Sequence, residues 1–175
     1  MSGNGRRWGS HRLKGSWADR IIRGAGLRGG ELVLDLGAGT GALTRPLARH
    51  AGRVIAVELH SGRVSGLTAA LGSSDAVTVV QADLLEVPLP RRPFRVVANP
   101  PYAIGAALVR RITARHSALT RADLVLPRWM ARRYAASPPH GFTAELGAHV
   151  PAAAFVPPPR SDSAVLVLRR VRKRR

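Results

Sequence analysis

The sequence contains no cysteine, only two lysines and few acidic residues. The absence of cysteine excludes disulfide bonds, thiolate metal sites and a cysteine nucleophile, and it fits a reducing compartment. No apolar run reaches the length of a membrane span, and the basic start of the chain is not followed by the apolar core of a signal peptide. We therefore expect a cytoplasmic protein without a membrane partner.

The excess of basic residues predicts a polyanionic partner. The chain carries 28 basic and 10 acidic residues, with a net charge of +18, and nearly all of the positive charge is arginine. Such a charge is self-repelling unless a polyanion compensates it, and guanidinium groups suit both phosphate oxygens and base faces. Codon bias in a GC-rich genome would favour arginine over lysine, but it does not account for the scarcity of acids. We expect binding to nucleic acid.

The 175 residues fit one domain with a core of its own. Residues 1–15 are polar and basic and predict an N-terminal arm, residues 16–171 the folded domain, and residues 172–175 a basic tail. Short apolar runs alternate with segments of helical periodicity, which is typical of an α/β fold with a mostly parallel sheet. Strands are expected at 31–35, 53–58, 77–82, 95–98 and 122–126, and helices at 17–26, 42–51, 62–71, 106–114 and 128–136. Two more strands, 142–149 and 163–171, flank a proline-rich loop and should pair antiparallel at the sheet edge.

A glycine-rich loop at residues 35–41 follows the first strand and opens a helix. Gly37 and Gly39 permit a tight turn and a close approach of the backbone to a ligand. With Ala42 they also satisfy the dinucleotide pattern, so the loop by itself leaves the cofactor open. Glu58, at the end of the second strand, can accept hydrogen bonds from both hydroxyls of a ribose, which suits either cofactor.

Asp83 closes the third strand and favours a methyltransferase over a dehydrogenase. Its carboxylate can accept a hydrogen bond from an adenine amino group, while the backbone N–H of Leu84 donates to the ring. A lone aspartate after a strand is also a common turn residue, so this reading depends on its neighbours.

The tetrapeptide Asn99-Pro100-Pro101-Tyr102 ends the fourth strand and carries the most specific chemistry. The N6 amine of adenine is a weak nucleophile because its lone pair is delocalised into the ring. The Asn99 side-chain oxygen and the Pro100 carbonyl can bind both amine hydrogens and direct the lone pair at a methyl donor. Two prolines keep this backbone rigid, and Tyr102 offers a face for an extruded base. A dehydrogenase has no use for this arrangement.

Phe155 precedes a proline-rich loop that is expected beyond the open end of the sheet. The side chain can cover the second face of the target base, or it can pack at the sheet edge. Both readings remain open from the sequence.

These motifs, together with residues 155–166, resemble the rRNA adenine N6-methyltransferases in content and order. That family includes the Erm macrolide-resistance enzymes and the small-subunit rRNA adenine dimethyltransferases. The chain is most similar to short mycobacterial-type Erm proteins without the helical C-terminal RNA-binding domain. The resemblance implies a Rossmann-like class I fold with a seven-stranded sheet, S-adenosyl-L-methionine as cofactor, no metal and a monomer.

The resemblance also implies the site. Catalysis falls to Asn99, Pro100 and Tyr102. The implied cofactor-binding residues are His11, Leu13, Asp35, Gly37, Ala38, Gly39, Glu58, Leu59, Asp83, Leu84 and Asn99. The implied contacts to the target base or RNA are Tyr102, Phe155, Arg6, Arg7, Arg12, Lys14 and Arg160. The implied target is the adenine of 23S rRNA at the macrolide site, whose mono- or dimethylation would confer macrolide, lincosamide and streptogramin B resistance.

The sequence departs from the family in its N-terminal motif, where Ser10-His11-Arg12-Leu13 stands in place of Gln-Asn-Phe-Leu. Pro100 replaces the Ile or Leu of Erm enzymes, and the basic arm and tail would supply the electrostatics of the missing domain. Two alternatives are adenine dimethylation of 16S rRNA in ribosome biogenesis and a non-enzymatic assembly factor that binds rRNA.

Overall fold

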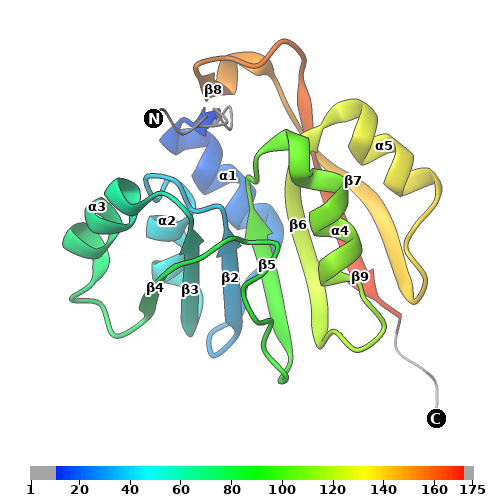
Figure 1. Cartoon of the computed structure of the whole chain (residues 1–175). Coiled ribbons are helices and arrows are strands. Elements are labelled where there is room, and N and C mark those ends of the chain that lie inside the picture. Colours follow the sequence, from blue (N-terminus) through cyan, green and yellow to red (C-terminus); the bar gives the residue numbers. More distant parts are fainter. Residues whose placement is uncertain (1–10, 172–175) are drawn as a thin grey trace, which may run out of the picture.

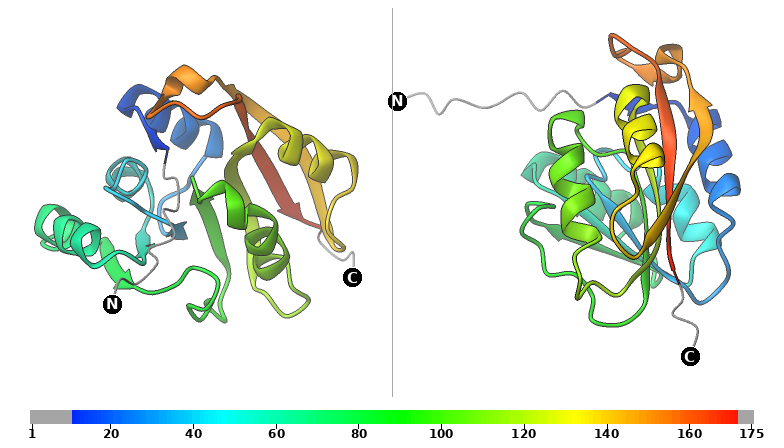
Figure 2. Two further views of the ribbon diagram at one scale, coloured as in Figure 1. Left: turned by 45° about the horizontal axis from the view of Figure 1, so that its top comes forward. Right: turned by 90° about the vertical axis from the view of Figure 1, so that its right-hand side faces the viewer.

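The computed structural model describes residues 11–171, which form a seven-stranded sheet covered by helices on both faces (Figures 1 and 2). The sheet strands are β2 (Leu32–Leu36), β3 (Arg53–Glu58), β4 (Val77–Gln81), β5 (Phe94–Ala98), β6 (Leu119–Pro127), β7 (Phe142–Val150) and β9 (Ser163–Arg170). The helices are α1 (Gly15–Ala25), α2 (Thr44–His50), α3 (Ser61–Leu71), α4 (Gly105–Ile112) and α5 (Arg128–Ala136), with short 3-10 turns η1 (Tyr102–Ile104) and η2 (Ala152–Ala154). Two short strands, β1 (Arg12–Leu13) and β8 (Phe155–Val156), pair outside the main sheet.

The sheet has the order β4-β3-β2-β5-β6-β9-β7. Strands β2 to β6 are parallel, and β9 runs antiparallel between β6 and β7. The expected α/β fold is therefore confirmed, with one refinement: the antiparallel strand lies one place inside the edge, and β7 forms the edge. The chain reverses its direction of travel across the sheet between β2 and β5, and ligands of such sheets bind at the carboxyl ends of the strands beside this reversal.

Alternating side chains along the strands divide the interior into two cores. On one face, Val33, Val97 and Val125 pack with the apolar side of α1, whose Ile21 and Ile22 are each 2% exposed. On the other face, the intervening strand residues pack with α4 and α5. Figure 2 shows the helices on the two sides of the sheet. Because both faces are covered, β2 and β5 are buried along their whole length, which explains their nearly continuous apolar sequences. No helix in residues 11–171 has the length and apolar character to span a membrane.

The folded domain begins earlier in the chain than the sequence indicated. Helix α1 begins at Gly15, and Leu13 in β1 is 1% exposed, paired with Phe155 in β8. Residues 11–15, which the sequence assigned to a basic arm, are therefore part of the fold. The rest of the expected arm and the basic tail, including Arg6 and Arg7, lie outside the described residues.

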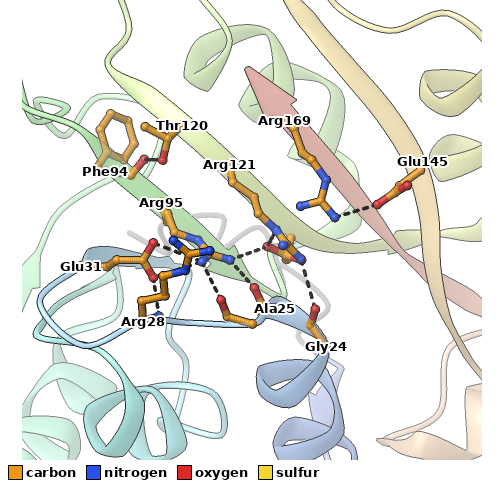
Figure 3. Close-up of polar contacts among 12 residues, drawn as sticks. Gly24, Ala25, Arg28, Glu31, Phe94, Arg95, Thr120, Arg121, Glu145 and Arg169 are labelled. Atoms are coloured by element: carbon orange, nitrogen blue, oxygen red, sulfur yellow. Dashed lines mark hydrogen bonds and ion pairs between the residues drawn. The ribbon is translucent and has the colours of Figure 1, made fainter. Parts of the chain in front are cut away.

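Two arginines, the buried Arg95 and the partly buried Arg121, hold the end of α1 against the sheet (Figure 3). Arg95 of β5 and Arg121 of β6 donate hydrogen bonds to backbone carbonyls of the last turn, those of Gly24, Ala25 and Gly26. Cations at the carboxyl end of a helix stabilise its unpaired carbonyls and its dipole. We call this group, with its acidic partners Glu31 and Asp123, the arginine clamp.

Within the arginine clamp, the two carboxylates balance the charges of the two arginines. Arg95 lies 3.1 Å from Glu31 and 3.4 Å from Asp123, and Arg121 lies 2.6 Å from Asp123. Arg95 is only 5% and Asp123 only 1% exposed. Burial raises the pKa of Asp123, and its hydrogen bonds and charge interactions with Arg121 and Arg95 oppose that rise. The clamp therefore ties α1, and the β1 strand that precedes it, to the centre of the sheet.

Candidate active site

The carboxyl ends of the parallel strands open on a cavity of about 760 Å³ beside the reversal between β2 and β5. This volume lies within the range of small-molecule sites. A smaller cavity of about 300 Å³ shares part of its lining with the first. The larger cavity is lined by the predicted residues His11, Gly37, Gly39, Glu58, Leu59, Asp83, Leu84, Asn99, Pro100 and Tyr102, and the smaller one adds Leu13, Asp35 and Ala38. Every residue expected to bind the cofactor thus borders one of the two cavities.

The loop after β2 needs its glycines. Gly37 and Gly39 have φ values of +86° and +59°, which side chains rarely tolerate. A Cβ atom on Gly37 would also lie 3.3 Å from Leu84 Cδ2 and 3.4 Å from Pro101 Cδ. The N–H groups of Gly37 and Ala38 donate to the Val57 carbonyl, which fixes the loop against β3. The backbone is therefore exposed to a ligand on a rigid support.

Glu58 is held in place by backbone donors at the end of β3. Its Oε2 accepts a hydrogen bond from the Gly39 N–H at 2.8 Å, and its Oε1 accepts one from the His60 N–H at 2.9 Å. Each carboxylate oxygen has a second lone pair, so the group can still accept hydrogen bonds from a diol. The side chain that the sequence assigned to a ribose is thus oriented before any ligand binds.

Asp83 turns the chain at the end of β4. Its Oδ1 accepts the Leu85 N–H at 2.8 Å, and its backbone carbonyl accepts the N–H groups of Glu86 and Val87. Asp83 is therefore a turn residue that also lines the large cavity together with Leu84, and its binding of an adenine stays a prediction.

Asn99 carries an unsatisfied acceptor. Its Nδ2 donates to the His11 carbonyl at 2.8 Å, which fixes the orientation of the amide, while its Oδ1 is buried without a hydrogen-bond partner in the described part of the chain. A buried oxygen without a donor costs about 1–3 kcal/mol, and such atoms need an explanation. Since Asn99 lines both cavities, a donor on a bound ligand is the natural partner.

Tyr102 is fixed by contacts that the sequence did not predict. Its hydroxyl shares a hydrogen bond of 2.6 Å with Ser163, the first residue of β9. Burial raises the pKa of the Tyr102 hydroxyl, and the Ser163 hydrogen bond opposes that rise. Ser163 belongs to the motif at residues 155–166, which was the only sequence signal that could have identified it.

His11 connects the entry of the chain to the tetrapeptide. Its ring lies with its centroid 5.5 Å from that of Tyr102, and its Nδ1 lies 2.8 Å from the Pro157 carbonyl. Because a carbonyl only accepts, Nδ1 must carry the hydrogen. The backbone carbonyl of the same residue binds Asn99, so His11 supports the predicted catalytic residues directly.

Phe155 is not placed to cover the second face of a target base. Its side chain is 2% exposed, packs in the core with Leu13 and borders neither cavity. The reason is the pairing of β8 with β1, which puts Leu13 and Phe155 opposite each other. Pro157 lines both cavities instead. Of the two readings left open by the sequence, the packing role is the one observed.

Of the basic residues assigned to RNA, Arg12, Lys14 and Arg160 are exposed, and Arg12 also borders the smaller cavity. No cluster of three or more His, Cys, Asp or Glu side chains suited to a metal ion occurs within residues 11–171.

Asp35 is a buried carboxyl group beneath the glycine loop. It is 1% exposed and accepts a hydrogen bond of 2.7 Å from the Thr44 hydroxyl. Burial raises the pKa of Asp35 to about 7; the Thr44 hydrogen bond lowers it, and the negative charge of Glu58 adds to the rise. A cationic ligand in the adjoining cavity would favour the ionised form.

Replacing Asp35 with asparagine is expected to raise the melting temperature of the ligand-free protein, and the gain should depend on pH. The unfolded chain loses this proton near the ordinary value of 3.8, and the folded chain only near 7. Stability from Asp35 is therefore lost as pH rises through this window, so the gain should grow from about pH 4 to 7 and then level off. We expect a few degrees, since about 1 kcal/mol corresponds to roughly 2–4 °C at this chain length. The exposed Asp75→Asn variant is the control, and a gain independent of pH would contradict the assignment.

The chain matches a known protein family in sequence. The sequence profile of the family described as "Ribosomal RNA adenine dimethylase" matches residues 6–175. The "Ribosomal RNA small subunit methyltransferase A" of Gloeobacter violaceus is 34% identical over 181 residues, covering 93% of this chain and 66% of that protein. The "rRNA adenine N-6-methyltransferase" of Corynebacterium diphtheriae is 38% identical over 152 residues, covering 79% and 58%. This chain thus spans less than two thirds of the length of either relative.

Among solved structures, the 23S rRNA methyltransferase ErmE superimposes with a TM-score of 0.83 and 30% sequence identity, over 91% of this chain and 70% of that one. A dimethyladenosine transferase from Plasmodium falciparum has a TM-score of 0.79 at 23% identity, over 92% and 64% of the two chains, and confirms the fold.

Proposed function

Because this chain belongs to the ribosomal RNA adenine dimethylase family, we propose that it transfers methyl groups from S-adenosyl-L-methionine to the N6 amine of an adenine in ribosomal RNA. The observation that carries the proposal is the buried Oδ1 of Asn99, an acceptor without a donor beside a cavity of suitable size. An adenine amine provides the missing donor.

The residues around the large cavity fit this cofactor. Glu58 would bind the ribose hydroxyls, Asp83 and the Leu84 N–H would bind the adenine ring, and Gly37 and Gly39 would allow close contact with the backbone. When bound, the cofactor supplies an electrophilic methyl group on a sulfonium. The carboxylate of Glu58, together with Asp35 in its ionised form, would give its cationic part a favourable environment.

The tetrapeptide prepares the amine for attack. Asn99 Oδ1 would accept one amine hydrogen and the Pro100 carbonyl the other, which would free the nitrogen lone pair from the ring for attack. The His11 carbonyl prevents rotation of the Asn99 amide, and Ser163 holds the Tyr102 ring as a platform for the extruded base. The methylated nitrogen carries a positive charge and can then release one of its protons to solvent, so no general base is required.

We further propose that the target lies in 23S rRNA at the macrolide site. The similarity to ErmE in structure and sequence supports this choice. The 34% identity to a small-subunit methyltransferase supports 16S rRNA as the second candidate. Both targets are adenines and both need the same pocket, so the difference must lie in the RNA-binding surface.

Mapping methylated adenines decides between them. The chain is expressed in a macrolide-sensitive bacterium, with the Asn99→Ala variant as a matched control, and N6-methyladenine is located in both rRNAs. We expect a new modification in 23S rRNA and a rise in macrolide resistance with the unchanged chain only. Modification of 16S rRNA alone would establish the second candidate. A purified chain that binds no S-adenosyl-L-methionine would instead support an assembly factor.

A further inference from the structure

The exposed side of helix α5 carries residues that are not needed for folding. Its inner side buries Met130 and Ala131 against the sheet, while Trp129 on the outer side is 61% exposed. The helix has three exposed arginines within about one turn of Trp129, namely Arg128, Arg132 and Arg133. We call these four residues the α5 face.

The charges of the α5 face destabilise helix α5. Arg128 lies at the amino end, where the helix dipole disfavours a cation, and it is followed by Arg132 at the like-charge spacing of four. The helix contains no acidic residue, and neither Arg132 nor Arg133 pairs with a carboxylate within residues 11–171. A large exposed aromatic ring beside two cations without a carboxylate partner, Arg132 and Arg133, therefore indicates a binding partner.

The first turn of α5 packs against residues that contact Tyr102 or closely follow it in the chain. Pro127, just before the helix, pairs with Ser163, whose hydroxyl holds Tyr102. The Arg128 N–H donates to the Asp162 carbonyl at 3.1 Å. A Cβ atom on Gly105 would lie 3.0 Å from the sulfur of Met130, so the segment after the tetrapeptide touches this turn as well. Figure 1 shows α5 continuing from the upper end of β6, near α4.

We propose that the α5 face binds single-stranded RNA next to the target adenine, with Trp129 stacked on an unpaired base and Arg132 and Arg133 on the phosphates. Aromatic rings stack on any base, and guanidinium groups bind phosphate oxygens in pairs. Extrusion of an adenine costs least where the base is already unpaired, so RNA that is single-stranded around the target is the favoured substrate. The inference rests on the proposed function in one respect, that the polyanion is RNA.

The test measures binding of the full chain to a fluorescently labelled single-stranded RNA of 12 nucleotides and to a hairpin that carries it in its loop. Trp129→Ala is expected to weaken both affinities about 5- to 100-fold. Arg132→Gln should reduce the slope of log affinity against log salt by about 0.7. Trp17→Phe, on the opposite face of the sheet, is the matched control and should change neither. Cofactor affinity should be the same in all variants.

Tryptophan fluorescence provides an independent readout. RNA should quench the emission of the unchanged chain, and Trp129→Phe should remove most of that quenching although Trp8 and Trp17 remain. If Trp129→Ala and Arg132→Gln bind RNA as the unchanged chain does, the α5 face is not the RNA site, while a methylating chain keeps its proposed function. If the unchanged chain binds poly-glutamate through Trp129 and no RNA, both proposals fall.

Discussion

Replacing Asn99 with alanine is expected to lower the rate of methyl transfer at least about a hundredfold, with little change in RNA affinity. The variant removes the acceptor that we propose to position the amine, and the loss of one preorganised hydrogen-bonding group costs about 10²–10³ in rate. Single-turnover transfer of labelled methyl groups to rRNA, with enzyme in excess, measures this step directly. RNA binding should persist because the exposed arginines are unchanged.

Asn99→Asp separates the two functions of the side chain. The aspartate keeps an acceptor for the amine but loses the donor that binds the His11 carbonyl, and it places a second oxygen where Nδ2 stood 2.8 Å from that carbonyl. We expect a rate between those of the alanine variant and the unchanged chain. An alanine variant with full activity would remove Asn99 from the mechanism.

The sequence predicted the sheet and the strand-end residues because both follow from short-range rules. The apolar runs of β2 and β5 and the helical periodicity of α4 and α5 are local patterns, and they placed all seven strands of the sheet within a few residues. Glu58 is the last residue of a parallel strand, and Asp83 and Asn99 each follow one, so the three had to meet at one edge of the sheet. That geometry placed them around a common cavity.

The features that the sequence did not predict depend on contacts between distant segments. Strands β1 and β8 have two residues each, too few to show a period, and only their pairing decides that Phe155 faces the core. Arg95 lies in an apolar run and binds Glu31, 64 residues away, so no local pattern reveals the ion pair. Ser163 forms its hydrogen bond with Tyr102 across 61 residues, so no local pattern reveals this contact either.

Replacing Arg95 with leucine is expected to lower the free energy of unfolding by about 3–5 kcal/mol. The variant leaves Asp123 buried with one cationic partner and removes donors from the last carbonyls of α1, and breaking a buried pair on one side typically costs that much. Urea denaturation followed by circular dichroism measures the change. Arg92→Leu is the control, because Arg92 is exposed just before β5 and should have an effect below about 0.5 kcal/mol.

The pH dependence of this loss distinguishes lost charge pairing from lost packing. Arg95 opposes the rise in the pKa of Asp123 that burial causes, so its removal should raise that pKa further. An ionised Asp123 then destabilises the folded variant most at neutral and alkaline pH. As pH falls and Asp123 takes up a proton, the penalty disappears, and the difference from the unchanged chain should shrink. A loss that stays the same from pH 5 to pH 8 would mean that Arg95 acts through its hydrogen bonds to α1 and its packing, and the arginine clamp would then not be an electrostatic device.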